Sequence, residues 1–179
     1  VKPYQPDGLW QEIASDTEYT QSHGDDLYRR SMYTYWKRTV APPAMVTLDA
    51  TRREACLVQR ARTNTPLQAL ALLNDVTFVE AARVFAQRVM VDIEGPMEDR
   101  IRQAFLIATA RMAKPEELAV LERRFHHSLE VFKNDPSAAH KLVHVGEFAV
   151  NETLDICELA AFTTLTSLIL NLDEVVNKE

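Results

Sequence analysis

Apolar residues recur at helical spacing through most of the chain after position 65. In the stretch that follows Gly95–Pro96 they return every three or four residues, so they fall on one face of a helix. The members of this stripe are Met97, Ile101, Ala104, Phe105, Ala108 and Met112. Similar patterns predict helices over residues 66–74, 76–90, 115–132, 138–145 and 154–170. No window alternates apolar and polar residues strongly enough to predict a central strand, and the pattern indicates an all-α fold with a multi-helix core.

Residues that favour helix starts stand where several of these stripes begin. Thr65 followed by Pro66 is typical of an N-cap with proline at the first helical position. Asp75 can cap the next helix in the same way. Glu116 and Glu117 follow a proline, and their negative charges suit the first turn of a helix. The local chemistry therefore agrees with the periodicity.

The first sixty residues show a weaker pattern. Residues 1–24 contain Pro3, Pro6, Gly8 and Gly24 and are expected to be mostly irregular, with one helical turn around Leu9–Ile13. A helix is predicted over residues 27–38, capped by Asp25 or Asp26, and residues 44–50 are expected to be extended because they adjoin two prolines. We therefore expect an irregular, aromatic-rich N-terminal arm over residues 1–62, packed on a helical core over residues 63–179, as one continuous domain.

The aromatic residues divide sharply along the chain. All five tyrosines and both tryptophans occur by position 36, whereas all seven phenylalanines occur at or after Phe78. Tyrosine and tryptophan suit half-wet surfaces and interfaces, whereas phenylalanine suits a dry core. We therefore predict an interface in the arm that uses Trp10, Tyr33 and Trp36. At least two of five aromatic side chains are expected to be exposed, these being Tyr4, Trp10, Tyr19, Tyr33 and Trp36.

Charge and hydropathy argue against a nucleic-acid partner and against a membrane-spanning helix. The net charge is −6, so there is no overall basic field to attract nucleic acid, and we predict no nucleic-acid partner. Residues 1–75 carry nine basic and nine acidic side chains, so the acidity belongs to the rest of the chain. The longest uncharged stretch, Leu159–Leu172, is 14 residues long, which is too short to span a bilayer. It is expected to be a buried core helix.

The two cysteines, Cys56 and Cys157, form no CxxC or CxxCH arrangement, so no structural zinc or covalently attached haem is expected in this chain. They are either buried free thiols or partners in one disulfide. The sequence begins with Val1 and shows no signal peptide, which is typical of a fragment or a processed product.

Arginines supply the densest candidate ligand site. Guanidinium groups grip carboxylate, sulfate or phosphate in a bidentate fork, so a cluster of them can bind an anionic ligand or a sulfated sugar. The predicted ligand-binding residues are Arg52, Arg53, Arg60, Arg62 and Asn64. The alternative is that the arginines pair internally with nearby acids, which the balanced charge of this region favours. The segment Arg62–Gln68 likewise supports either an anion site at a helix N-terminus or simple capping.

Other patterns give weaker signals of chemistry. His140 and His144 are spaced by four residues and are followed by Glu147, a spacing that can hold a metal, yet the pattern is not HExxH. We interpret them as surface histidines and predict no metal site. The chain lacks GxSxG, Walker A and GxGxxG sequences, and no catalytic residue is identified.

Several runs resemble one protein family. These runs are Asp26–Thr39, Arg53–Cys56, Arg60–Asp75 and Phe78–Arg83, with further likeness at Lys2–Trp10, Glu158–Ala161 and Leu170–Glu174. They are similar to the C-terminal domain of unknown function in large planctomycete proteins, which typically carry a planctomycete-type cytochrome c domain near the N-terminus. The likeness spans nearly the whole chain and is most specific around Arg62–Asn74.

The resemblance implies a context rather than a reaction. It implies that the chain is the C-terminal part of an exported protein, periplasmic or at the cell surface, with haem c bound by another domain. We interpret the chain as a non-catalytic helical module that docks onto the preceding domains of the same polypeptide. The alternative is part of an enzyme that acts on a carbohydrate or another exported substrate, with its site shared with those domains. An anionic or glycan ligand fits either hypothesis.

Overall fold

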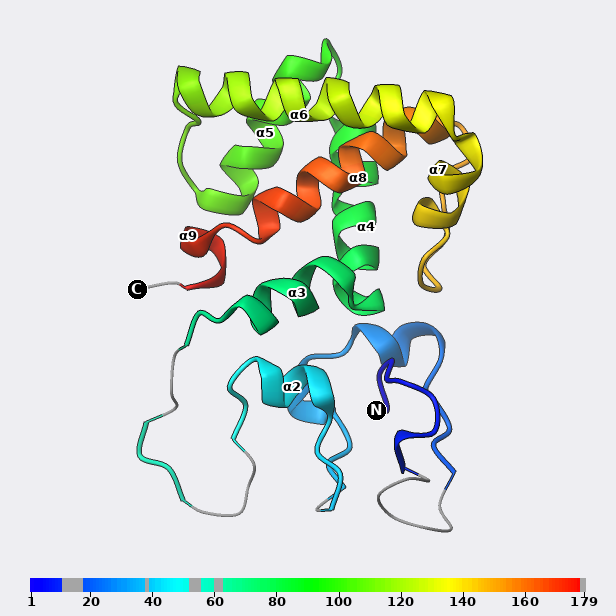
Figure 1. The fold of residues 1–179 in the computed structure, drawn as a ribbon, viewed down its shortest axis with the longest axis vertical. Helices are drawn as coiled ribbons and strands as arrows, with labels where there is room; N and C mark the ends of the chain where they lie inside the picture. Colours follow the sequence, from blue (N-terminus) through cyan, green and yellow to red (C-terminus); the bar gives the residue numbers. More distant parts are fainter. Residues whose placement is uncertain (11–17, 38, 52–55, 60–62, 178–179) are drawn as a thin grey trace. The chain divides into compact units, whose positions relative to one another are not determined.

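The computed structural model describes residues 1–10, 18–37, 39–51, 56–59 and 63–177. The chain forms two compact units, Val1–Ala71 and Leu72–Glu179. The described elements are helical, and the β pairing among them is an isolated bridge between Lys37 and Val40 (Figure 1). The predicted all-α fold with an irregular N-terminal region is therefore confirmed. The predicted arm-and-core boundary after residue 62 stays a prediction.

Within its described residues 18–37 and 39–51, the first unit contains the short 3-10 helices η1 (Gly24–Tyr28) and η2 (Ser31–Tyr33) and the α-helix α2 (Pro43–Thr47). The helical turn expected around Leu9–Ile13 lies mostly outside the described residues. The predicted α-helix over residues 27–38 is wrong. The backbone N–H of Tyr35 donates to the carbonyl oxygen of Val1 (2.7 Å) rather than to a residue one turn earlier. The apolar stripe of this segment is also largely exposed, and a helix without a buried face gains little stability.

The expected extended segment over residues 44–50 is also wrong, because α2 begins at Pro43. Proline disfavours the α conformation only in the residue that precedes it, and its own fixed φ suits the first turn of a helix. Pro42 is accordingly extended, with ψ at 123°, and the helix starts immediately after it. In this sequence Pro–Pro therefore marks the start of a helix.

The second unit is a bundle built mainly from five helices. Their bounds are α4 (Val76–Asp92), α5 (Met97–Thr109), α6 (Pro115–Asn134), α7 (Pro136–Val143) and α8 (Ile156–Leu170). A short helix, α9 (Asp173–Val176), ends the described chain, and α3 (Pro66–Asn74) joins the two units. The helices predicted from periodicity after residue 65 are thus present, with ends that differ by a few residues.

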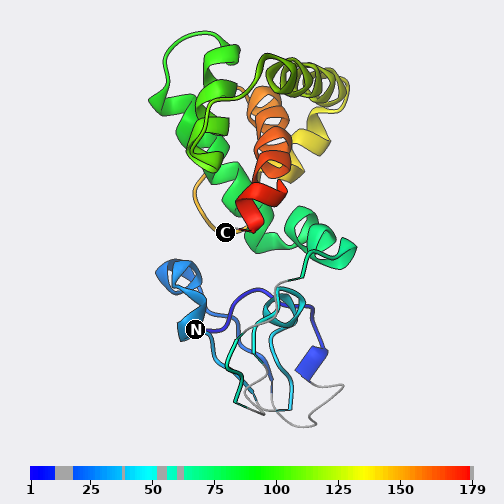
Figure 2. The same ribbon diagram turned by 90° about the vertical axis from the view of Figure 1, so that its left-hand side faces the viewer.

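Helix α8 is the centre of this unit. It contacts α4, α5, α6, α7 and α9, and it lies between α4 and α5 on one side and α6 and α7 on the other (Figure 2). Leu159, Phe162, Leu165 and Ile169 are at most 1% exposed, so the expected core helix is confirmed. Leu168 was expected to share this burial, but it is 36% exposed because it lies on the solvent side of the last turn.

The core of α8 also contains hydroxyl groups. Thr166 is fully buried, and its Oγ1 donates to the carbonyl oxygen of Ala82 on α4 (2.9 Å) or of Phe162 one turn earlier (3.0 Å). A buried hydroxyl needs such partners, because an unsatisfied one costs more than its hydrogen bond gains. The threonines in the long uncharged stretch are therefore compatible with a dry core. No helix in the described part of the chain is long and apolar enough to cross a membrane.

The helix starts follow the predicted chemistry. Thr65 Oγ1 accepts from the backbone N–H of Gln68 (3.3 Å), and Gln68 Oε1 accepts from the N–H of Thr65 (2.8 Å). This reciprocal pair is a capping box, in which two unpaired helix-end donors are satisfied together. Asp75 caps α4 by accepting from the N–H of Thr77 (2.9 Å).

We expect Thr65→Ala to lower the free energy of unfolding by about 0.5–2 kcal/mol, because one end of the capping box is lost. Thr65→Asp is expected to be nearly neutral, since its carboxylate accepts the same N–H and suits the positive end of the helix. Urea unfolding followed by circular dichroism measures both changes. If Asp proved as harmful as Ala, capping would not explain this threonine.

Candidate functional site

An aromatic cluster in the N-terminal unit is centred on the buried ring of Trp10. Trp10 is 5% exposed, and its ring lies edge-on to that of Tyr19, with 4.9 Å between centroids, and tilted against that of Tyr35 at 5.8 Å. Two ammonium groups lie on the cluster. The Nζ atom of Lys37 is 4.5 Å from the Trp10 centroid, and that of Lys2 is 5.4 Å from it. Both distances are within the range of cation–π attraction.

Backbone hydrogen bonds hold the start of the chain against this cluster. Lys2 and Ser22 bond twice, since the N–H of Lys2 donates to Ser22 Oγ (3.0 Å) and the N–H of Ser22 donates to the carbonyl oxygen of Lys2 (2.9 Å). The Tyr19 hydroxyl donates to the carbonyl oxygen of Pro3, and burial raises the pKa of Tyr19 to about 12. Lys2 and Pro3 are thereby held to the segment around Tyr19 and Ser22.

A pocket of about 290 Å³ opens beside the cluster. Its lining combines aromatic rings, two carboxylates and two side-chain amides. The lining residues are Gln5, Pro6, Asp7, Gly8, Trp10, Glu18, Tyr19 and Gln21. Asp7 and Gly8 form a turn in which Gly8 has a φ of 76°, a conformation that glycine adopts at little cost. The turn brings Asp7 to the pocket.

Most of the aromatic side chains that were predicted to be exposed are buried or half-buried. Trp10 is buried and Trp36 is half-buried, whereas Tyr33 is 52% exposed. Tyr4 and Tyr19 are also half-buried, so Tyr33 alone of the five is substantially exposed and the expectation of at least two is wrong. The reason is that Trp10 and Tyr19 pack on each other and on lysine side chains. The exposed large side chains of this region form a run instead, made of Tyr28, Met32, Tyr33 and Tyr35.

Thr63 and Gln68 both bind the side chain of Asp49, which sequence reasoning did not identify as a shared acceptor. The Asp49 carboxylate accepts from the backbone N–H of Thr63 (2.8 Å), from Thr63 Oγ1 (2.7 Å) and from Gln68 Nε2 (3.0 Å). Asp49 itself has a φ of 60°, a strained conformation for a residue with a side chain. Three accepted bonds hold the residue in that conformation.

Four of the five residues of the predicted arginine site lie in segments that the structure does not describe. Arg52, Arg53, Arg60 and Arg62 lie outside the described residues, so their role in ligand binding stays a prediction. Asn64 is exposed between Thr63 and Thr65, whose side chains take part in the Asp49 contacts and the capping box respectively. In this segment the described hydroxyls thus serve local structure, as the capping interpretation expected.

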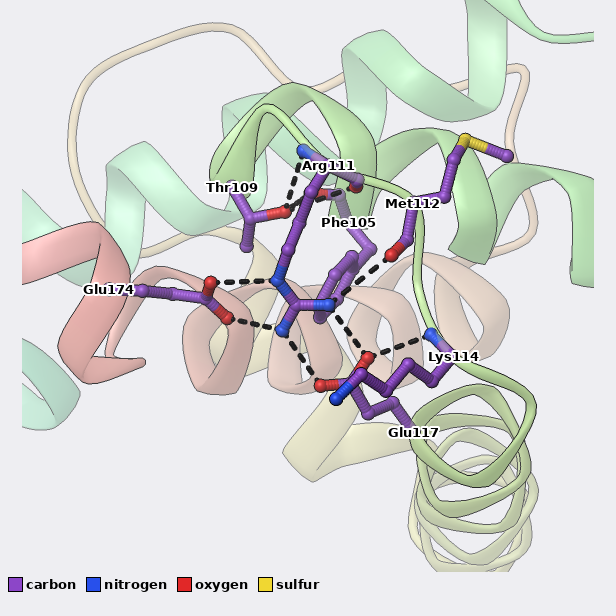
Figure 3. Close-up of polar contacts among 7 residues, drawn as sticks. All are labelled: Phe105, Thr109, Arg111, Met112, Lys114, Glu117 and Glu174. Carbon is purple, nitrogen blue, oxygen red and sulfur yellow. Dashed lines mark hydrogen bonds and ion pairs between the residues drawn. The ribbon is translucent and has the colours of Figure 1, made fainter.

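In the helical unit, one arginine joins two segments that are far apart in sequence. Arg111 follows α5 and makes paired hydrogen bonds with Glu117 at the start of α6 (2.7 and 2.8 Å) and with Glu174 on α9 (2.7 and 2.9 Å), as Figure 3 shows. Its guanidinium also lies 4.7 Å from the Phe105 ring centroid. The arginine bonds lower the pKa of Glu117 to about 2 and raise that of Arg111. We call these three residues the Arg111 clasp.

The clasp predicts a pH dependence with a definite sign. Because the folded-state pKa of Glu117 is depressed from 4.5 to about 2, its contribution to stability is present above pH 4.5 and is lost as the pH falls toward 2. We expect the difference in Tm between the natural chain and Arg111→Met to be constant above pH 5 and to shrink between about pH 4.5 and 2. Thermal melts at a series of pH values measure it. A difference that stayed constant to pH 2 would contradict the assignment.

Two charged residues of α4 are buried and pin a distant loop. Arg83 is fully buried, and its guanidinium donates to the carbonyl oxygens of Phe148 (2.5 Å) and Ala149 (3.0 Å). Glu80 is 3% exposed and accepts from the N–H of Phe148 (2.6 Å). Gly146 also belongs to this contact, because a Cβ there would lie 2.3 Å from the Glu80 carboxyl group. The arrangement fixes the α7–α8 connection to α4.

The structure also places the histidine pair and the two cysteines that the sequence singled out. The rings of His140 and His144 stack with 3.9 Å between centroids, and both residues are exposed, as the surface interpretation expected. No group of three or more metal-ligating side chains occurs among the described residues. Both cysteines are free thiols, with Cys157 half-buried. Cys56 is exposed, so the expectation of a buried thiol is wrong there.

Sequence reasoning missed the residues that organise both units. Lys2, Lys37 and Asp49 carry no periodic signal, because they lie in segments without regular structure. The burial of Arg83 was equally invisible, although one signal was available. Arg83 and Glu80 lie among residues that face the core of α4, so their positions imply charged groups that need polar partners inside the protein.

Comparison with known proteins gives a family and no activity. No curated protein and no solved structure matches this chain. A family model described as PSD1, a protein of unknown function (DUF1553), matches residues 1–125, which include the aromatic cluster, the pocket, the Asp49 contacts and most of α6. The chain therefore belongs to the PSD1 (DUF1553) family of proteins of unknown function.

Proposed function

We propose that this chain is a docking module that binds the preceding domains of a larger, exported, cytochrome c-associated polypeptide. The observation that carries the proposal is the exposed run in the N-terminal unit. Tyr28, Met32, Tyr33 and Tyr35 are between 47% and 62% exposed within eight residues of sequence. Tyrosine and methionine are enriched at protein interfaces, and isolated surfaces rarely gather them so closely.

The electrostatics of this region agree with docking. The charges of residues 1–75 balance, so the surface suits a protein partner better than a strongly charged ligand. Tyr19, Arg111 and Glu117 have clearly shifted pKa values, and each is held in a structural contact. Active sites commonly contain such groups poised for proton transfer. The enzyme alternative stays a hypothesis.

The context of the proposal comes from the family resemblance. The likeness to C-terminal domains of large planctomycete proteins supports a parent polypeptide with a cytochrome c domain that binds haem c. It also supports an extracytoplasmic location. On this proposal the docking partner is part of the same polypeptide, and the chain itself needs no cofactor.

Hydrogen exchange of the parent polypeptide, compared with that of this chain alone, tests the docking. We expect residues 28–35 to exchange more slowly in the parent. Met32→Ala and Tyr33→Ala should remove that protection, because exposed anchors at an interface commonly contribute about 1–2 kcal/mol each. Met112→Ala is the matched control, since Met112 is 67% exposed in the helical unit. Equal exchange of residues 28–35 in both proteins would refute docking at this run.

A further inference from the structure

The pocket beside the aromatic cluster has a lining that the docking proposal does not use. Its residues come from the segments on either side of Trp10, and they differ from the exposed run at residues 28–35. We propose that this pocket binds a neutral sugar, as a monosaccharide or the end unit of a short oligosaccharide. The argument rests on the polar groups in the lining, on the charge balance around it and on its size.

The polar groups match the hydroxyls of a sugar. Asp7 and Glu18 are exposed carboxylates that line the pocket, and no other described residue binds either of them. Each oxygen can therefore accept a hydroxyl hydrogen bond, and bonds to a charged acceptor are the stronger kind. Gln5 adds an amide group that both donates and accepts. A ligand dense in hydroxyls can satisfy this lining.

The charge balance selects a neutral ligand. Two carboxylates line the pocket, and two ammonium groups, those of Lys2 and Lys37, lie on the aromatic cluster behind it. An anion would meet the carboxylates directly. A cation would compete with Lys2, whose Nζ already lies 5.4 to 5.8 Å from the centroids of Trp10, Tyr19 and Tyr35. We therefore expect a neutral polar ligand to bind in this pocket more favourably than an anion or a cation.

Lys37 strengthens this argument. Its Nζ atom is buried with no hydrogen-bond partner among the described residues, and it lies 4.5 Å from the Trp10 ring centroid. A buried ammonium is costly without compensation, and the Trp10 ring offsets part of that cost through cation–π attraction. The two lysines thus place positive charge on the same aromatic cluster whose Trp10 and Tyr19 rings line the pocket.

The size and the apolar part of the lining complete the fit. At about 290 Å³ the pocket is at the small end of ligand sites, which suits a single sugar ring better than a larger cofactor. Trp10 and Tyr19 contribute apolar ring surface, and the C–H face of a sugar can pack on such surface. Tyr19 is held in place by its bond to Pro3, so the pocket wall is ordered before a ligand arrives.

Fluorescence titration of the full chain tests the proposal. In a Trp36→Phe background, Trp10 is the single tryptophan and reports directly on the pocket. The probes are glucose, galactose, N-acetylglucosamine, maltose and cellobiose, with tetramethylammonium chloride and sodium sulfate as charged comparisons. We expect a saturable change in Trp10 emission with at least one of the sugars at millimolar concentration, and none with the two salts.

Variants of the lining separate binding from a general solvent effect. Glu18→Gln and Asp7→Asn are each expected to weaken sugar binding by at least about tenfold, because each removes a charge-assisted acceptor. Both side chains are exposed, so the variants should keep the Tm of the parent. Glu130→Gln, an exposed position on α6, is the matched control and should bind normally.

Three outcomes would overturn the proposal. These are the absence of a saturable response to every sugar, a response that both lining variants leave unchanged, and saturable binding of either salt at the pocket. The indole N–H resonance of Trp10 in an NMR titration gives a second readout that does not depend on emission intensity. Because docking is tested at Met32 and Tyr33, each proposal can fail while the other stands.

Discussion

Leu165→Ala is expected to lower the free energy of unfolding of the helical unit by about 2–5 kcal/mol, the range for a buried leucine truncated to alanine. Leu165 is fully buried at the centre of α8, which contacts five other helices of this unit. A cavity there would remove contacts from several helices at once, and close packing leaves little room for them to collapse into it.

The two units can be followed by separate signals. Both tryptophans lie in the first unit, whereas the second holds five long helices, so tryptophan emission reports on one and circular dichroism mainly on the other. Leu168→Ala is the matched control on the same helix, because Leu168 is 36% exposed and should cost much less. A loss below about 0.5 kcal/mol for Leu165→Ala, the range of surface changes, would show that α8 is not the core.

Arg83→Met is expected to cost about 3–5 kcal/mol, as removal of one partner from a buried charged network does. The substitution leaves the carbonyl oxygens of Phe148 and Ala149 without their guanidinium donors. It also leaves the carboxylate of Glu80 buried without the cation one turn away. Methionine fills a similar volume, so most of the loss reflects unsatisfied polar groups rather than a cavity.

Arg88→Met on the same helix is the control. Arg88 is exposed and pairs with Asp92 across one turn of α4 (3.4 Å), so its loss should cost less than about 0.5 kcal/mol. Hydrogen exchange at Phe148 gives a local readout, because its N–H donates to Glu80 and should open in Arg83→Met. Similar unfolding free energies for Arg83→Met and Arg88→Met would contradict the role assigned to the buried arginine.

The helices after residue 65 were predictable because their signals are local. The spacing of apolar residues sets the buried face of a helix, and residues such as Thr65 and Asp75 satisfy its first N–H groups from within three positions. Apolar spacing and capping residues therefore produce a helix wherever the folded protein provides an apolar surface for the helix to pack against. The bundle around α8 offers that to each of the five long helices.

The same reasoning failed for the first unit because its residues bond to residues that are distant in sequence. The segment at Tyr35 pairs with Val1 rather than with its own preceding turn, and this long-range bond decides against the α-helix that its periodicity suggested. Trp10 was expected on the surface because of its residue type, yet Tyr19, Tyr35 and two lysines enclose it. Composition describes what a side chain can contact, and only the fold decides which contacts form.

The sequence by itself therefore determined the all-α class, the places where helices begin after residue 65 and the identity of the central helix. Only the tertiary structure decided which aromatics are buried, which acids line the pocket and how Arg83 meets a loop 65 residues away. The physical reason is the range of the interactions. Helix periodicity and capping act over a few residues, whereas pockets, buried charges and cation–π contacts need groups that the folded chain alone brings together.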